Sequence, residues 1–144
     1  MNAIDFLTKD HREVESLFKQ INSDPDNGQV LAGQLRLALL AHTRIEEQIF
    51  YPALKKFDEL RDLVAESLQE HQQVEKELEQ MSSISMDSKS WQNIVDKLQR
   101  DVEHHVREEE GEMFPKVQRL IDEETLNEMG RELEITKTKE MVSL

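Results

Sequence analysis

Four long stretches of this chain carry apolar residues at alternating spacings of three and four, and each stretch has a histidine within its apolar series. This spacing places residues on one face of an α-helix, so it predicts four amphipathic helices at about residues 4–22, 31–57, 60–81 and 91–120. An amphipathic helix buries its apolar face against other helices. The fold therefore has to accommodate four imidazoles in its interior.

The connections between these helices indicate the architecture. Residues 23–28 and 82–88 are dense in turn-forming residues, and the join between the second and third helices is short. Short connections make neighbouring helices antiparallel. We therefore predict the all-α fold class, as an up-down-up-down antiparallel four-helix bundle over about residues 2–121, within a single domain of residues 1–144.

A shorter fifth helix is expected after the bundle, at about residues 122–140. Leu126, Met129 and Leu133 supply its apolar face, while Gly130 weakens it. We expect this helix to pack on the outside of the bundle.

Composition limits the classes of partner and of site. The 31 acidic and 18 basic residues give a formal net charge of -13, so nucleic acid and anionic membrane surfaces are not expected as partners. The chain has no cysteine, which excludes disulfides, zinc-thiolate sites and iron–sulfur ligation. No apolar run reaches the roughly 20 residues that span a membrane, and residues 1–10 lack the basic and apolar regions of a signal peptide. We expect a cytoplasmic protein in which any metal is held by nitrogen and oxygen.

An internal repeat includes all four histidines. His42 with Glu46, in the second helix, recurs 63 residues later as His105 with Glu109, and each pair is followed at the same distance by an aromatic residue and a proline. The first and third helices share another signature, 60 residues apart: Asp10, His11 and Glu15 against Glu70, His71 and Glu75. The bundle is therefore expected to consist of two related helical hairpins.

The histidine and glutamate of each pair lie four residues apart, so they project from one helix face and both can approach one metal ion. Antiparallel packing brings the four histidines, each near the middle of its helix, to about one level of the bundle. Burying Glu46 and Glu109 as bare carboxylates would be costly, and no Lys or Arg occupies neighbouring inward positions. A bound cation would supply the counter-charge. Imidazole and carboxylate suit iron, manganese or zinc, so the residues alone leave the metal open.

The order histidine, HxxxE, histidine, HxxxE resembles the hemerythrin-like, HHE cation-binding family over about residues 4–120. This resemblance implies a non-haem di-iron centre in which two carboxylates and an oxo or hydroxo group bridge two iron ions. The implied ligands are Glu46 and Glu109 as bridges, His11 and His42 on one iron, and His71 and His105 on the other.

Two departures from oxygen-carrying hemerythrins bear on function. Those proteins have a fifth histidine four residues after the position matched by His71, where this chain has Glu75. Their last bridging carboxylate is an aspartate five residues after its histidine, where this chain has Glu109 four residues after His105. A carboxylate in place of an imidazole leaves a harder, more exchangeable iron, which disfavours reversible oxygen carriage. Glu75, and Glu15 by symmetry, are candidates for an additional ligand or a supporting carboxylate; the alternative is a solvated helix charge.

Other polar residues beside the ligands are expected to face solvent. His104 lies about 100° round the helix from His105. Within the acidic run at residues 108–112, only Glu109 is expected to point inward.

These features predict a di-iron protein that binds or reacts with a small oxidant, namely dioxygen, hydrogen peroxide or nitric oxide, with a role in oxidative stress. If it is an enzyme, we expect a catalase-like or peroxidase-like oxidoreductase without catalytic residues separate from the metal ligands. One alternative is a sensor or store of oxygen or iron without turnover. Another is iron donation for iron–sulfur cluster repair, which resembles family members with a cysteine-containing amino-terminal domain, whereas this chain starts directly with its first helix.

Overall fold

The computed structural model describes residues 1–144, and its only regular elements are helices. The α-helices are α1 (Ala3–Ser23), α2 (Gly28–Ile45), α3 (Tyr51–Leu54), α4 (Asp58–Ser83), α5 (Lys89–Glu108), α6 (Phe114–Leu120) and α7 (Glu123–Ser143). A 3-10 turn, η1 (Pro25–Asn27), precedes α2, and two π-helical segments, η2 (Glu46–Phe50) and η3 (Glu109–Met113), join α2 to α3 and α5 to α6.

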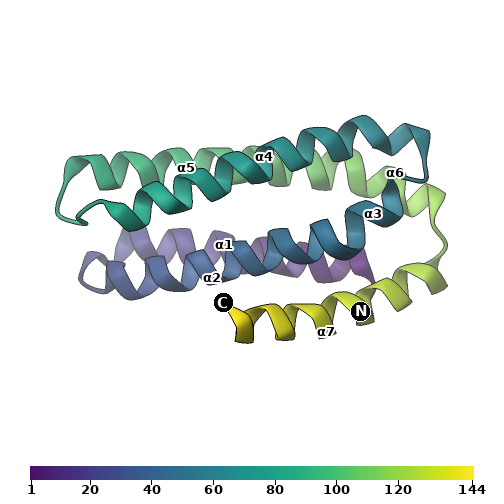
Figure 1. Ribbon diagram of the computed structural model, residues 1–144, viewed down its shortest axis with the longest axis horizontal. Coiled ribbons are helices and arrows are strands. Elements are labelled where there is room, and N and C mark those ends of the chain that lie inside the picture. The colour runs from purple at the N-terminus through teal and green to yellow at the C-terminus, as the bar shows by residue number, and fades with distance from the viewer.

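These elements form four long antiparallel rods, with α7 beside them (Figure 1). The first rod is α1, and the second is α2 continued by η2 and α3. The third rod is α4, and the fourth is α5 continued by η3 and α6. This arrangement confirms the predicted all-α four-helix bundle. None of the helices combines the length and the apolar character that a membrane crossing requires.

Capping side chains set the start of three helices. Asn2, Ser88 and Asp122 precede α1, α5 and α7, and the side chain of each accepts a hydrogen bond from the backbone amide three residues later. Such caps satisfy amides that have no partner inside the helix. These helices consequently begin within a few residues of the boundaries that the sequence predicts.

The two π-helical segments lie at equivalent positions of the repeat. η2 begins at Glu46 and η3 at Glu109, and the amides of Tyr51 and Phe114 donate to the carbonyls of these glutamates, five residues earlier. A proline follows each aromatic residue, and its missing amide hydrogen interrupts regular α-helical bonding. π turns occur frequently at functional sites. Both glutamates predicted as bridges therefore stand at the first residue of a π turn.

Two apolar clusters fill the bundle along its length. One has 16 buried residues, among them Leu7 and Phe50, and the other has 15, among them Phe18 and Leu35. His11 falls between these clusters along α1, because Leu7 belongs to one and Phe18 to the other. The histidines thus form a polar layer in the middle of an otherwise apolar core.

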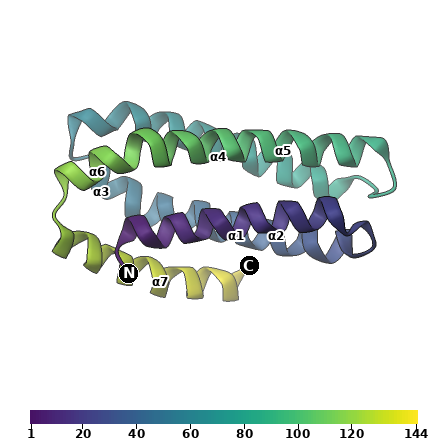
Figure 2. The ribbon, with the colours of Figure 1, turned by 180° about the vertical axis from the view of Figure 1, so that it is seen from behind.

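Helix α7 packs along α1 and α2, outside the four-helix bundle (Figure 2). Its residues Leu126, Met129 and Leu133 are buried, as the sequence predicts. Gly130 lies against the start of the chain, where an added Cβ would be 2.2 Å from the carbonyl oxygen of Met1. Glycine is therefore required there by the close approach of the N-terminal segment.

Candidate metal centre

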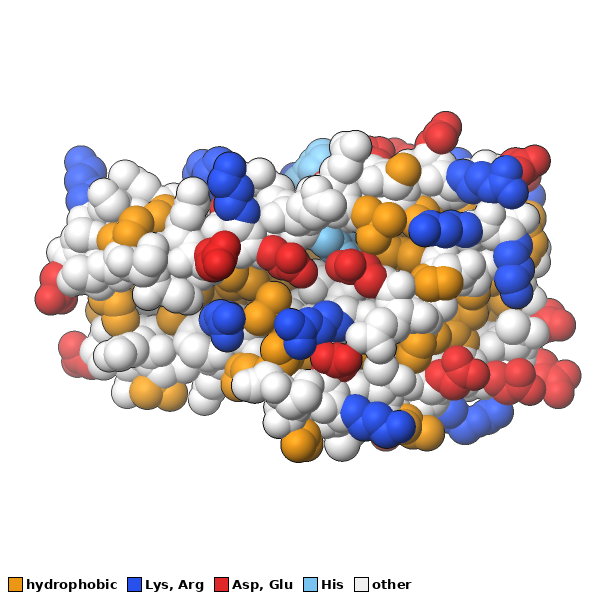
Figure 3. All heavy atoms as spheres, viewed as in Figure 1, with side chains coloured by type: hydrophobic (Ala, Val, Ile, Leu, Met, Phe, Trp, Pro, Cys, Tyr) orange, Lys and Arg blue, Asp and Glu red, His pale blue; other side chains and the backbone are white.

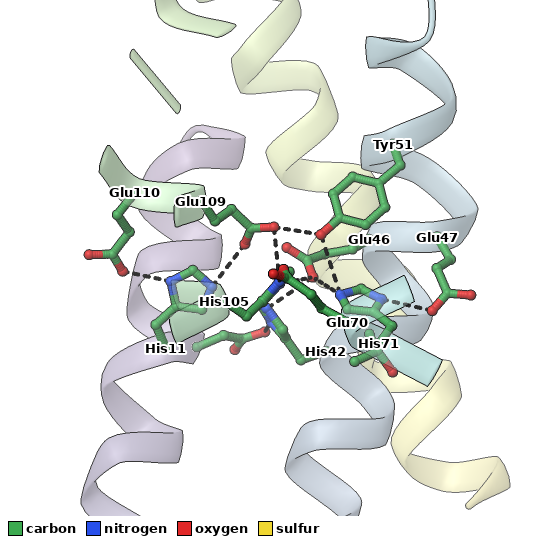
Figure 4. Close-up of polar contacts among 12 residues, drawn as sticks. His11, His42, Glu46, Glu47, Tyr51, Glu70, His71, His105, Glu109 and Glu110 are labelled. Carbon is green, nitrogen blue, oxygen red and sulfur yellow. Dashed lines mark hydrogen bonds and ion pairs between the residues drawn. The ribbon is translucent and has the colours of Figure 1, made fainter. Parts of the chain in front are cut away.

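The six side chains predicted as ligands meet in the polar layer between the rods (Figure 4). The rods that carry them are α1, α2 with η2, α4, and α5 with η3. Each of the six is at most 6% exposed: His11, His42, Glu46, His71, His105 and Glu109. Their positions within the apolar faces are the reason that packing brings them inside.

Glu46 lies between histidines from both halves of the repeat. Its Oε1 atom is 3.3 Å from Nε2 of His42 and 3.0 Å from Nε2 of His71. The same oxygen is 3.9 Å from Nε2 of His105. One carboxylate is therefore within reach of imidazoles on three different rods.

Glu109 occupies the corresponding position from the other side. Its Oε1 is 3.0 Å from Nε2 of His11, and its Oε2 is 3.4 Å from Nε2 of His105. The potential ligand atoms fall into two groups, each with its atoms within 4.8 Å of one another: His11, His42, Glu46 and Glu109, and Glu46, His71 and His105. The groups share Glu46, which is the arrangement expected of two adjacent metal positions.

The other ring nitrogen of each of the four buried histidines, Nδ1, donates to a carboxylate on a different rod. The pairs are His11 with Glu110 at 2.6 Å, His42 with Asp10 at 2.9 Å, His71 with Glu47 at 2.8 Å, and His105 with Glu70 at 2.7 Å. An ionised carboxylate only accepts, so Nδ1 must carry the hydrogen. A neutral imidazole then directs its Nε2 lone pair into the centre, as in carboxylate–histidine–metal arrangements.

These four carboxylates were not predicted as site residues, although the sequence contained a signal for them. Asp10 and Glu70 immediately precede the histidines of the first and third helices, and Glu47 and Glu110 immediately follow the glutamates of the HxxxE pairs. The repeat therefore extends to the residues that orient the imidazoles.

Several buried atoms of the centre have no hydrogen-bond partner. They are Nε2 of His42 and of His105 and both carboxylate oxygens of Glu46. Native proteins rarely leave such atoms unpaired, because each loses its bonds to water. Cations at the two positions would satisfy all of them, because His42 belongs to one group of potential ligand atoms, His105 to the other and Glu46 to both. Imidazole nitrogen and carboxylate oxygen fit iron, manganese or zinc.

The charges of the centre are balanced by protons when no metal is bound. Burial alone would lower the pKa of His42, but the charge of Glu46, whose Oε1 is 3.3 Å away, and the hydrogen bond to Asp10 raise it to about 10. Burial likewise opposes protonation of His105, whose pKa the charge of Glu109 raises well above its usual value. A metal ion at Nε2 would have to displace these protons, so metal binding and proton release are coupled.

Tyr51 is a residue of the centre that the sequence did not identify. Its hydroxyl donates to Oε2 of Glu109 at 2.5 Å and lies 3.3 Å from Nε2 of His71. Burial and the neighbouring carboxylates raise its pKa well above the usual value, so it keeps its proton. The repeat has Phe114 at the equivalent position, stacked on the ring of His11 with centroids 5.9 Å apart. The hydroxyl therefore serves only one half of the centre.

The structure does not bring Glu75 or Glu15 to the six predicted ligands. Glu75 is exposed on α4, and Glu15 forms an ion pair with Arg12 along α1. Neither belongs to a group of potential ligand atoms. Both positions fit the alternative of a solvated helix charge.

The acidic run at residues 108–112 differs in one respect from the prediction. Glu110 was expected to face solvent, but its carboxylate accepts the hydrogen bond from His11. The π turn that begins at Glu109 changes the direction of the side chains that follow it. His104 is exposed as predicted and pairs with Glu108 at 3.0 Å.

A small apolar cavity adjoins all four histidines. Its volume is about 20 Å³, which is room for one water-sized molecule. The walls are the four imidazoles together with Val14, Leu39, Thr43, Val74, Val102 and Val106. Any molecule that reaches the centre through this cavity must be small.

Comparison with protein families identifies the bundle. The model of the hemerythrin HHE cation binding domain matches residues 2–117 of the chain. The chain belongs to this family. The hemerythrin-like resemblance of the sequence is thereby confirmed, and the clusters of histidine and glutamate lie in a cation-binding domain.

Individual relatives of this hemerythrin-like chain agree with the fold. A crystal structure of a hemerythrin HHE cation binding domain-containing protein from Mycobacterium kansasii superposes with a TM-score of 0.89 at 25% identity, covering 99% of this chain and 89% of that one. An uncharacterized hemerythrin-like protein of Schizosaccharomyces pombe is 28% identical over 92% of this chain and 68% of its own length. A protein of Nostoc sp. named DNA nickase is 30% identical over 96% of this chain, which spans 40% of that protein.

Proposed function

We propose that this hemerythrin-like chain holds two iron ions in its polar layer. The ligands would be Glu46 and Glu109 as bridges, His11 and His42 on one ion, and His71 and His105 on the other, with an oxo or hydroxo group between the ions. The observation that carries this proposal is the convergence of unpaired, buried nitrogen and oxygen atoms in two groups that share Glu46. Iron is favoured over manganese and zinc by the resemblance to hemerythrins.

We further propose that the centre binds or reacts with a small oxidant such as dioxygen, hydrogen peroxide or nitric oxide. A bound iron pair would supply redox chemistry toward such molecules. The cavity of about 20 Å³ beside the histidines supports this choice, because it excludes larger substrates. The residues of the chain orient the imidazoles, exclude water, and keep a hydroxyl proton on Tyr51 beside Glu109.

The test is reconstitution of the metal-free protein with ferrous iron under nitrogen, followed by metal analysis and exposure to each oxidant. We expect two irons per chain and a new charge-transfer absorption band on oxidation. A band that forms and disappears with oxygen pressure would support carriage, whereas consumption of hydrogen peroxide with gas release would support an enzyme. Iron that is retained without reacting with any oxidant would overturn the proposed reactivity and favour storage or sensing.

Matched variants make the site assignment falsifiable. His42→Ala should lose iron, while Glu75→Gln, on an exposed position of α4, should keep it. Unchanged iron content in His42→Ala, or fewer than two irons in the parent chain, would refute the proposed centre.

The name DNA nickase belongs to the Nostoc protein, of which this chain spans 40%. A net charge of -13 repels a phosphate backbone. On the face shown in Figure 3, basic side chains are interspersed with acidic ones rather than gathered in a patch. We propose that nucleic acid is not a partner, and a shift in DNA mobility on addition of the protein at low salt would contradict this.

A further inference from the structure

The four carboxylates that accept hydrogen bonds from the histidine Nδ1 atoms occur at equivalent positions of the two repeat halves. The basic residues around them do not. The carboxylates behind His11 and His42 each form an ion pair with a basic side chain, and those behind His71 and His105 have no Lys or Arg within ion-pair distance. The paired carboxylates are Glu110, with Arg12, and Asp10, with Lys137; the unpaired ones are Glu47 and Glu70. The two halves of the centre therefore differ in the cations that lie beside these carboxylates.

Lys137 is the more buried of the two cations, and it comes from α7, outside the bundle. Its Nζ atom is 2.5 Å from Oδ1 of Asp10, whose other oxygen, Oδ2, is 2.9 Å from Nδ1 of His42. The side chains of Lys137 and Asp10 are 23% and 5% exposed, so solvent screens this pair only partly. Arg12 is 50% exposed, and its charge acts more weakly.

The corresponding place in the other half is acidic. Oε1 of Glu70 is 2.7 Å from Nδ1 of His105. Apart from His105 itself, the basic group within ion-pair distance of Glu70 is the imidazole of His104, at 3.5 Å, which is also 3.0 Å from Glu108. Glu66 belongs to the same group of acidic side chains. No cation comparable to Lys137 compensates the carboxylate behind His105.

We propose that Lys137 is a positioning residue that makes the two metal positions unequal, acting through Asp10 on the imidazole of His42. The position at His11 and His42 then binds a divalent ion more weakly and fills second. This inference rests on the two-metal centre of the proposed function. A carboxylate behind a ligating histidine makes the imidazole a stronger donor, and a cation on that carboxylate withdraws part of the effect. The charge of Lys137, which the exposed carboxylate of Glu13 at 3.5 Å offsets only in part, also repels the metal ion directly.

Helix α7 accordingly has a role beyond covering the bundle. Removing the charge of Lys137 should strengthen metal binding at the nearer position, whereas removing an ordinary structural contact should weaken it. The opposite signs of these two effects separate an electrostatic role from a structural one.

The test is a titration of the metal-free protein with cobalt(II), monitored by calorimetry and by visible absorbance. The parent chain should bind two equivalents in two steps, and His42→Ala should lose the weaker step. Lys137→Met should tighten the weaker step by about tenfold, within the range that residues behind metal ligands influence affinity. Lys137→Arg should resemble the parent chain, as should Lys139→Met, which removes an exposed charge from the same helix.

Two results would overturn this proposal while leaving the two-metal centre intact. In the first, the chain binds two equivalents of cobalt, but Lys137→Met leaves the affinity of the weaker step unchanged or lowers it. This result would mean that Lys137 only anchors α7. The other is loss of the tighter step in His42→Ala. Binding of a single equivalent by the parent chain would instead refute the two-metal centre itself.

Discussion

The hydroxyl of Tyr51 allows a direct test of how the fold prepares the centre before metal binds. Tyr51 is 1% exposed, and its hydroxyl donates to Oε2 of Glu109 at 2.5 Å. Tyr51→Phe removes a single oxygen atom and leaves the ring in its apolar cluster. In the variant, Nε2 of His105 still lies 3.4 Å from this carboxylate oxygen. The buried carboxylate therefore loses its shortest hydrogen bond.

The size of the expected loss of stability in Tyr51→Phe follows from the charge of the acceptor, Glu109. A hydrogen bond to a charged group contributes about 1.5–3 kcal/mol, and its loss here leaves the acceptor buried, so we expect the free energy of unfolding to fall by about 2 kcal/mol. For a chain of this size, that corresponds to a fall in Tm of roughly 5–8 °C. The effect should be smaller with metal bound, because a cation would share the charge of Glu109.

The assay is urea denaturation of chelator-treated protein at neutral pH, monitored by circular dichroism. Thr43→Val is a suitable control, because the hydroxyl of Thr43 donates to the neutral backbone carbonyl of Leu40 at 3.2 Å. Its loss should cost less, about 1 kcal/mol. A Tyr51→Phe protein whose stability lies within about 0.5 kcal/mol of the parent chain would refute the hydrogen bond and the reasoning built on it.

Three further predictions concern the ligands, α7 and pH. His42→Ala and Glu109→Ala should each lower metal content and melting temperature together, because metal-binding energy is partly folding energy. Glu75→Gln should change neither. Metal analysis and calorimetry measure the two quantities. Gly130→Ala should destabilise the chain by about 1–3 kcal/mol, because the new Cβ would lie 2.2 Å from the carbonyl oxygen of Met1, and an unaltered melting temperature would argue against this contact. The pKa of His42 is raised from 6.5 to about 10 in the metal-free protein, so its contribution to stability is complete below pH 6.5 and is lost as the pH rises through about 10. As the pH rises through about 10, chelator-treated protein should therefore become less stable, whereas the affinity for added metal should increase. Equal stability in urea at neutral and alkaline pH would contradict the raised pKa of His42.

The fold and the six inward side chains could be predicted because both follow from periodicity within single helices. Spacings of three and four place His11 and His71 in apolar faces, and the HxxxE pairs repeat that arrangement on the other two rods. The same periodicity predicted the helix α7 and its buried face, which includes Leu126 and Leu133. The proline after each HxxxE pair was visible in the sequence as well, but its consequence, a π turn that starts at the glutamate, became clear only in the structure.

The sequence by itself thus determined which helix faces are buried and which residue types they carry, whereas the tertiary structure alone decided which groups meet across helices. Periodicity relates a residue to the axis of its own helix, but the rotation and register of neighbouring helices depend on how all their side chains pack. Glu110 reaches His11, Tyr51 reaches Glu109, and Lys137 of the outer helix reaches Asp10, each from a distant part of the chain. The unequal distribution of cations between two halves that look alike in sequence is a property of that packing.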